Sequence, residues 1–418
     1  MRYDPPAMTD TARLDAPLPL PCGATLKNRF MKSAMSEQLG DARNDATHGL
    51  ATLYGTWADG GTGLLVTGNV MIDRTALGEP LNVAIDGRSN TDALARWAEA
   101  ARRNDTHVWM QLNHPGKQSP SVLSREPVAP SAVAIEGPLG RFFNKPQALS
   151  DADVHALVER FAEGAAIAQR AGFTGVQIHG AHGYLVNQFL SPHHNRRDDA
   201  WGGDAERRRA FVVAVYRAIR ARVGKSFPVS IKLNSADFQR GGFTEEESMA
   251  VIDALVAEGI DLVEVSGGTY EAPAMTGFAA DSTRKREAYF LDFAERARQR
   301  VKGGAALAVT GGFRSGPAMR DAVASGATDV VGLARTLALY PDLPARVLRD
   351  PSWSVTLTRP STGIKAVDRA SMLDISYYET QLERMAQGLP ADPSLSAWRA
   401  VYSVFSRMGL AALQPRRA

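Results

Sequence analysis

Short apolar runs alternate with helical segments along most of this chain, and that alternation restricts its fold more than any other feature. The runs are four to six residues long and mostly apolar, as expected of parallel strands that are buried on both faces. Eight strand-then-helix units predict a (β/α)8 barrel, or TIM barrel, and the alternative is an open, doubly wound sheet. The eight runs lie at residues 29–33, 64–68, 107–112, 176–179, 229–233, 262–265, 307–310 and 329–333.

Helix-capping residues between the runs support this interpretation. Ser150 with Asp153, and Thr244 with Glu247, have the spacing of capping pairs and predict helix starts. Gly259 predicts the end of the second of these helices. Further helices are expected near residues 50–57, 92–102, 206–223, 287–300, 317–324 and 337–348.

Two segments lie outside the eight strand–helix units of a minimal barrel. Residues 113–149, after the third strand, are rich in Pro, Gly and Ser, and we expect a hairpin-like lid over the barrel mouth. After the barrel, two helical patterns at 371–387 and 395–410 are expected to pack on the barrel or on a neighbouring subunit, which leaves a homo-oligomer open. The expected organisation is a flexible leader at residues 1–17, the barrel at 18–350 and a helical extension at 351–418.

Composition excludes several classes of protein. The 418 residues are 44% hydrophobic and 22% charged, which is typical of globular proteins, and the net charge of +3 is too small to indicate nucleic-acid binding. No apolar run approaches the roughly 18 residues of a membrane span, and the N-terminus has no targeting signal. The single cysteine, Cys22, excludes an intramolecular disulfide and a Cys-ligated cluster. We therefore expect a cytoplasmic protein without nucleic-acid or membrane partners.

The fourth strand is followed by a group of side chains suited to catalysis. Functional residues of this fold gather at the carboxyl ends of the strands, where His179, His182 and Tyr184 follow one another closely. Two imidazoles three residues apart on one helical turn would project to the same side and donate to one carbonyl or phenolate oxygen. The Tyr184 hydroxyl would supply a proton. A metal site is the weaker alternative because a third ligand is missing, and we predict no metal.

A phosphate site is predicted after the last two strands, where barrels often bind phosphate. Gly311 and Gly312 allow backbone N–H groups to approach an anion closely. Ala334 adds an N–H group at a helix start, and Arg335 adds a guanidinium fork.

Several motifs together resemble the old yellow enzyme family of FMN-dependent ene-reductases. The segment at residues 179–192 and the run at 195–211 are similar to the family's most specific patterns, although Trp201 replaces the usual Tyr and Arg207 the usual Asn. The resemblance extends over roughly residues 18–350. Further similar motifs lie at residues 26–35, 111–117, 265–269 and 332–335.

The resemblance implies a set of residues that bind the flavin. Ala34, Met35 and Ser36 would lie along it, with the Ser36 hydroxyl donating to the O4 edge. Gly68 would leave a side-chain-free wall beside the ring. Gln111 would pair with the pyrimidine edge, and Lys232 would place a cation near N1 and C2=O, which favours the anionic reduced flavin.

The implied activity is reduction of the C=C bond of α,β-unsaturated carbonyl compounds, with bound FMN and transient NAD(P)H in a ping-pong cycle. An oxidative demethylase or an NADH oxidase on the same scaffold, and a non-catalytic flavin-binding protein, remain alternatives. Lys232 also ends a barrel strand as Schiff-base lysines do, although Gln111 and the phosphate loops favour a flavin.

Overall fold

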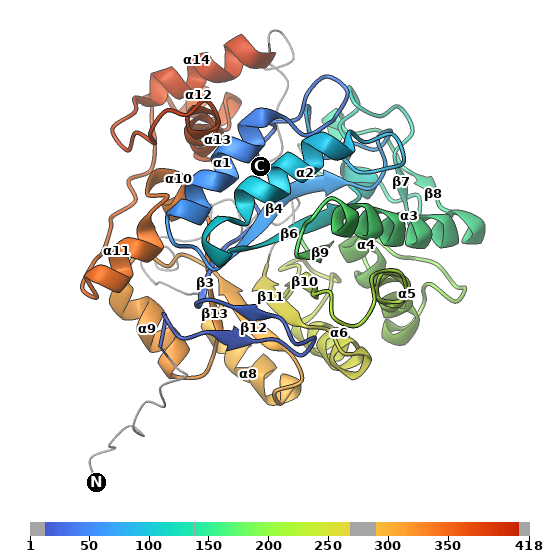
Figure 1. Ribbon diagram of the computed structural model, residues 1–418. Helices are drawn as coiled ribbons and strands as arrows, with labels where there is room; N and C mark the ends of the chain where they lie inside the picture. Colours follow the sequence, from blue (N-terminus) through green and yellow to red (C-terminus); the bar gives the residue numbers. More distant parts are fainter. Residues whose placement is uncertain (1–12, 138, 268–289, 409–418) are drawn as a thin grey trace.

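Eight parallel strands close into a barrel in the computed structural model, which describes residues 13–137, 139–267 and 290–408 (Figure 1). The last strand pairs in parallel with the first, and the first with the second, which closes the sheet. This confirms the predicted (β/α)8 barrel, because each predicted run overlaps one of these strands. They are β3 (Phe30–Lys32), β4 (Leu64–Met71), β6 (His107–Asn113), β9 (Gly175–Gly180), β10 (Val229–Asn234), β11 (Leu262–Ser266), β12 (Ala306–Thr310) and β13 (Val330–Leu333); a short β5 (Val83–Ala84) adds to β4.

Helices cover the outside of the barrel and begin where the caps predict. Both capping boxes are present, at Ser150 with Asp153 and at Thr244 with Glu247. One expectation is wrong: residues 337–348 form two short helices, because Pro341 lies between them and cannot supply a backbone donor. The helices are α1 (His48–Asp59), α2 (Thr91–Ala101), α3 (Asp151–Arg170), α4 (Leu185–Leu190), α5 (Ala205–Val223), α6 (Glu245–Glu258), α8 (Leu291–Val301), α9 (Gly316–Ala324), α10 (Arg335–Leu339) and α11 (Leu343–Arg349).

The excursion after β6 differs from the hairpin that the sequence suggests. Its strands β7 (Val128–Ala129) and β8 (Gln147–Ala148) pair in parallel, and a single antiparallel bridge joins Pro120 to Phe143. Parallel neighbours cannot be joined by a tight turn, so the chain between them forms a wide loop. A short 3-10 helix precedes β7 at Gly116–Gln118, and a second lies within the loop at Gly140–Phe142.

The amino-terminal end of the barrel is closed by apolar side chains. The antiparallel pair β1 (Leu18–Pro19) and β2 (Thr25–Leu26) contributes to a buried cluster with residues of β3, β4, β6, β11, β12 and β13. The packed chain begins before the expected boundary at residue 18, because Leu14 is buried and its carbonyl accepts from the N–H of Arg29. A polar ligand therefore has access to the barrel interior at the opposite end.

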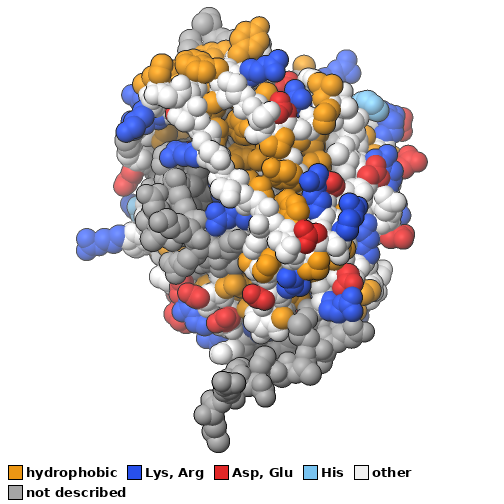
Figure 2. Space-filling model, turned by 90° about the vertical axis from the view of Figure 1, so that its left-hand side faces the viewer, with side chains coloured by type: hydrophobic (Ala, Val, Ile, Leu, Met, Phe, Trp, Pro, Cys, Tyr) orange, Lys and Arg blue, Asp and Glu red, His pale blue; other side chains and the backbone are white. Residues whose placement is uncertain are grey.

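The C-terminal extension packs on its own barrel. Its helices α12 (Lys365–Ala370), α13 (Leu373–Ala386) and α14 (Ala397–Met408) lie beside α1 and α10, with α13 in contact with both (Figure 1). The space-filling view of this side shows hydrophobic side chains gathered in a band, with Lys and Arg side chains nearby (Figure 2). No helix within the described part of the chain is long and apolar enough to span a bilayer.

A buried ion pair closes the loop that follows β3. The ammonium group of Lys32 is fully buried and donates to the Glu37 carboxylate, the Tyr54 hydroxyl and the Val66 carbonyl, each at 2.9 Å. The Tyr54 hydroxyl also donates to Glu37. Lys32 and Glu37 stand at the two ends of residues 33–36, so the pair holds this short loop in one position.

We expect Lys32→Met to lower the free energy of unfolding by about 3–5 kcal/mol, because it leaves the Glu37 carboxylate buried without its cation. The double variant Lys32→Met/Glu37→Leu should recover much of that loss, since it removes both charges. Urea unfolding of both single variants and the double variant measures this. A double-variant loss equal to the sum of the single losses would show that the two side chains are not coupled.

Candidate active site

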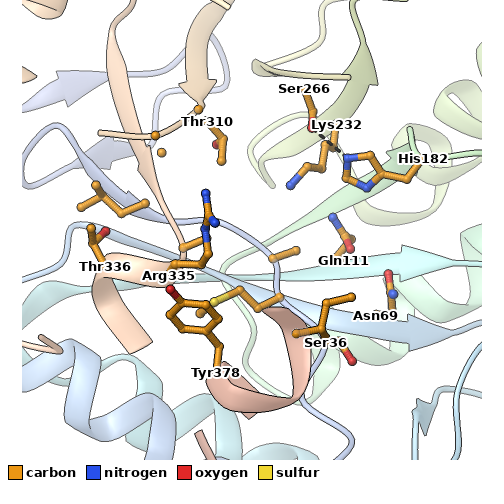
Figure 3. Close-up of a pocket in the computed structure, with 18 of the residues that line it drawn as sticks. Ser36, Asn69, Gln111, His182, Lys232, Ser266, Thr310, Arg335, Thr336 and Tyr378 are labelled. Atoms are coloured by element: carbon orange, nitrogen blue, oxygen red, sulfur yellow. Dashed lines mark hydrogen bonds between the residues drawn. The ribbon is translucent and has the colours of Figure 1, made fainter. Parts of the chain in front are cut away.

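A cavity of about 280 Å³ opens at the carboxyl ends of the strands. Figure 3 shows Lys232, Gln111 and His182 on one side of it, and Arg335 with Tyr378 on the other. Twelve of the thirteen residues predicted from the sequence line this cavity, although they come from strands far apart in the chain. The twelve are Ala34, Met35, Ser36, Gln111, His179, His182, Tyr184, Lys232, Gly311, Gly312, Ala334 and Arg335.

Gly68 is the predicted residue that does not line this cavity. It lies behind the loop after β3, where a Cβ atom would come within 2.6 Å of the Met35 carbonyl oxygen and 2.9 Å of Glu37 Oε2. Its N–H donates to the Tyr54 hydroxyl at 3.1 Å. A side chain at residue 68 would displace the loop that carries Met35, so glycine allows the loop to pack closely against the strand. Its expected place beside a flavin ring stays a prediction.

The two histidines converge by a different route from the predicted helical turn. His179 belongs to β9, His182 lies in the turn that follows, and α4 begins only at Leu185. His182 and Gly183 both have left-handed backbone angles, with φ of 62° and 76°. This turn folds the chain back at the strand end, so the two imidazole centres lie 5.2 Å apart.

Side-chain hydrogen bonds hold this unusual turn. The His182 N–H donates to Asn234 Oδ1 at 3.2 Å, and the Gly183 N–H donates to Asn187 Oδ1 at 2.7 Å. Both amides in turn donate to the buried Asp237 carboxylate, at 3.2 and 3.1 Å. Left-handed backbone at a non-glycine residue costs free energy and persists only where surrounding contacts fix it. None of these three residues was predicted from the sequence, because they act through contacts between residues distant in the chain.

Burial keeps both imidazoles neutral. Desolvation lowers the pKa of His179 and of His182 well below 6.5, and the nearby ammonium of Lys232 lowers both further. The His182 ring nitrogen Nε2 lies 2.8 Å from the Ser266 hydroxyl (Figure 3). The Tyr184 ring packs edge-on against His179, with ring centres 4.7 Å apart. One wall of the cavity thus combines two neutral imidazoles with a phenol.

The floor of the cavity is a buried polar network. Lys232 Nζ lies 2.9 Å from Glu264, which also accepts from Gln177 at 2.9 Å and from Thr310 at 2.7 Å. Gln111 donates to Gln177 at 2.8 Å. Lys232 is therefore an ion-paired cation, with a weaker field than the lone cation that the sequence suggested. The sequence does contain a signal for this network, because Gln177 and Glu264 are polar residues inside strands that were predicted to be buried.

The C-terminal extension contributes a wall that the sequence did not predict. Ile375, Tyr378, Glu379 and Leu382 of α13 line the cavity, whereas none of the described residues of 113–149 does. The expected lid from this segment stays a prediction. The aromatic pattern of this segment predicted packing, but no local feature indicated that it would reach the site.

Ser36 is held by carboxylates in this arrangement. Its hydroxyl lies 2.7 Å from Glu79 Oε2 and 3.1 Å from Glu379 Oε1, which also accepts from Gln38 at 2.7 Å. The hydroxyl that was expected to donate to a flavin O4 atom thus has acceptors from the protein. Glu79 and Glu379 give this side of the cavity a negative character.

The donor set fits a flavin mononucleotide. Gln111 and Lys232 suit the polar edge of a heterocycle, and the glycine loop with Arg335 suits a phosphoryl group. The wall of neutral imidazoles suits an oxygen on which negative charge develops. No group of three or more His, Cys, Asp or Glu side chains in the described part of the chain is arranged to hold a metal ion.

Comparison with known proteins identifies relatives over most of the chain. Residues 14–350 match the family model of the NADH:flavin oxidoreductase / NADH oxidase family. The NADH-dependent flavin oxidoreductase iliE of Hypocrea jecorina (strain QM6a) is 37% identical over 364 residues, which are 81% of this chain and 90% of that protein. The NADH-dependent flavin oxidoreductase iccE of Talaromyces variabilis is 38% identical over 358 residues, covering 79% and 85% of the two chains.

Solved structures share the fold. The old yellow enzyme homologue from Zymomonas mobilis superimposes with a TM-score of 0.69 at 23% identity, covering 82% of this chain and 95% of that one. At this identity the likeness shows a common barrel and nothing about the substrate.

We expect the free energy of unfolding to fall as the pH decreases from 7 towards 5. Burial lowers the pKa of His179, His182 and His194, and that of His114 to about 4, so these side chains stay neutral in the folded protein while the unfolded chain gains protons below pH about 6.5. Below pH about 6.5, each such histidine lowers the free energy of unfolding by up to about 1.4 kcal/mol for every unit by which the pH falls.

Urea unfolding at a series of pH values measures this dependence. The His114→Gln variant should lose part of the slope, because it removes one of the groups. Stability that is unchanged or higher at pH 5 would contradict neutral, buried imidazoles.

Proposed function

The chain belongs to the NADH:flavin oxidoreductase / NADH oxidase family, and from that premise we propose that it reduces the C=C bond of α,β-unsaturated carbonyl compounds. The family assignment makes the protein an oxidoreductase that works with FMN and NAD(P)H, as the resemblance to old yellow enzymes implied. The choice of enones rests chiefly on one observation: two neutral imidazoles and the Tyr184 phenol share one wall of the cavity.

The residues that would hold FMN lie at two ends of the cavity. Gln111 and Lys232 would contact the pyrimidine edge, and Gly311, Gly312 and Arg335 would contact the phosphate. When bound, FMN supplies hydride transfer from the nicotinamide and to the substrate. The Lys232–Glu264 pair is close to neutral overall, so it would orient the pyrimidine edge more than it attracts negative charge.

His179 and His182 would bind the carbonyl oxygen of the substrate. A neutral imidazole donates one hydrogen bond without giving up its proton readily, so two of them polarise the C=C–C=O system and stabilise the negative charge that develops on oxygen. Donors fixed by the Asn234 and Asp237 network require little reorganisation as that charge develops.

Tyr184 is the proposed proton donor to the α-carbon. The side-chain amide of Asn69 donates to its phenolic oxygen at 3.3 Å. A donor to that oxygen stabilises the phenolate that remains after the proton leaves, and thereby makes the phenol a better acid.

A second candidate is oxidation of a cationic N-methylated amine. Glu79 and Glu379 both line the cavity beside Ser36, and carboxylates would attract an ammonium group. We rank this below enone reduction, because a cationic ammonium group does not accept the hydrogen bonds that His179 and His182 can donate.

Anaerobic absorption spectroscopy of the FMN-loaded protein separates these activities. NADH or NADPH should bleach the flavin, and 2-cyclohexenone should restore its colour. Failure of the enone to restore the colour, together with bleaching by an N-methylated amine in the absence of NAD(P)H, would overturn the proposal in favour of the second candidate.

Tyr184→Phe should slow the reaction of reduced protein with 2-cyclohexenone by roughly 10²–10⁴-fold, the usual contribution of a positioned general acid. Reduction by NADH should change little, because hydride acceptance needs no proton from this residue. Stopped-flow absorbance measures the two half-reactions separately.

Tyr378→Phe is the matched control, since Tyr378 also lines the cavity but lies across it from His182 (Figure 3). It should leave the enone reaction nearly unchanged. If Tyr184→Phe slows both half-reactions equally, Tyr184 is not the proton donor.

A further inference from the structure

A second hollow lies beside the active-site cavity, within the C-terminal extension. Its volume is about 350 Å³, and its walls are formed by residues between 359 and 375. Asp374 and Ile375 line both spaces, so the two share a wall. Pro360, Met372 and Leu373 make much of its lining apolar.

The rim of this hollow is basic. Lys365 and Arg369 stand four residues apart in α12 and therefore on one face of it, and both are exposed. Neither forms an ion pair with any residue that the structure describes. A third cation, Arg359, is fixed by donating to both oxygens of the Asp374 carboxylate.

The carboxylates that line the hollow form no ion pair with Lys365 or Arg369. Asp368 also lines the hollow, but it accepts from the Ser361 hydroxyl at 2.7 Å and from the Thr362 N–H at 2.9 Å. Its charge is thus directed into the loop before α12. Within the described residues no carboxylate pairs with Lys365 or Arg369, so both can contact an anion from outside the chain.

A nicotinamide dinucleotide has parts that match this arrangement. Its nicotinamide ring has to reach the active-site cavity, while its pyrophosphate carries two negative charges and its adenine is flat and largely apolar. The cations of the active-site cavity already have other partners. Lys232 is paired with Glu264, and Arg335 lies at the proposed phosphate site for FMN. The remainder of the dinucleotide needs cations and an apolar surface beyond the shared wall.

We propose that the hollow beside the active site binds the pyrophosphate and adenosine part of the nicotinamide reductant, with Lys365 and Arg369 contacting the phosphates and Pro360 and Met372 forming part of the surface under the adenine. This inference rests on the use of NAD(P)H and is independent of the substrate that accepts the hydride.

Two ligands that share the reduced nicotinamide riboside test the proposal. Tetrahydro-NADH is a non-reactive dinucleotide, and tetrahydronicotinamide riboside lacks both phosphates and the adenosine. Binding of each to the FMN-loaded protein is measured by titration of the flavin spectrum. The double variant Lys365→Ala/Arg369→Ala should weaken dinucleotide binding by at least about tenfold, the effect of losing even one charge-assisted hydrogen bond, and leave riboside binding unchanged.

The control is Lys225→Ala/Arg349→Ala, which removes the same two charges from exposed positions in other parts of the barrel. It should bind both ligands as the unmodified protein does. Unchanged dinucleotide binding in the α12 variant, or an equal loss for both ligands, would overturn the proposal. Neither result would argue against enone reduction, because the experiment measures binding without turnover.

Discussion

The ion pair between Lys232 and Glu264 determines what the carboxyl end of this barrel can contain. Burying two charges is costly unless every remaining hydrogen-bonding position is satisfied. Here Gln177 and Thr310 donate to Glu264, and Gln111 donates to Gln177, so together with Lys232 side chains from five different strands are fixed in one network. Because the opposite end is sealed by apolar residues, this network becomes the floor of a single polar cavity.

The chemistry of the walls follows from the same burial. Desolvation and the ammonium of Lys232 keep the imidazoles of His179 and His182 neutral, which makes them hydrogen-bond donors instead of acids. The proton in the proposed reaction then has to come from another group, and Tyr184 is the phenol beside them. The Asp237 carboxylate contributes indirectly, since the amides that it holds fix the left-handed turn at His182.

The sequence predicted the features that depend on local chemistry. Strand positions and both capping boxes follow from periodicity and caps. Twelve of the residues that line the cavity follow from the rule that function lies at strand ends, together with the family resemblance. The sequence did not predict the features that depend on contacts between distant residues. The left-handed turn at His182 is held by residues of β10 and of the loop after it, and Gly68 allows the loop after β3 to pack closely against β4. The wall from α13 was missed for the same reason, because docking of a helix far along the chain leaves no local pattern.

A crystal structure of the protein with FMN and a bound enone tests the account most directly. We expect the pyrimidine edge within about 3.5 Å of Gln111 and Lys232, the phosphate at Gly311, Gly312 and Arg335, and the enone oxygen within hydrogen-bonding distance of both His179 and His182. An FMN phosphate bound at another loop, or an enone oxygen directed away from the two imidazoles, would contradict it.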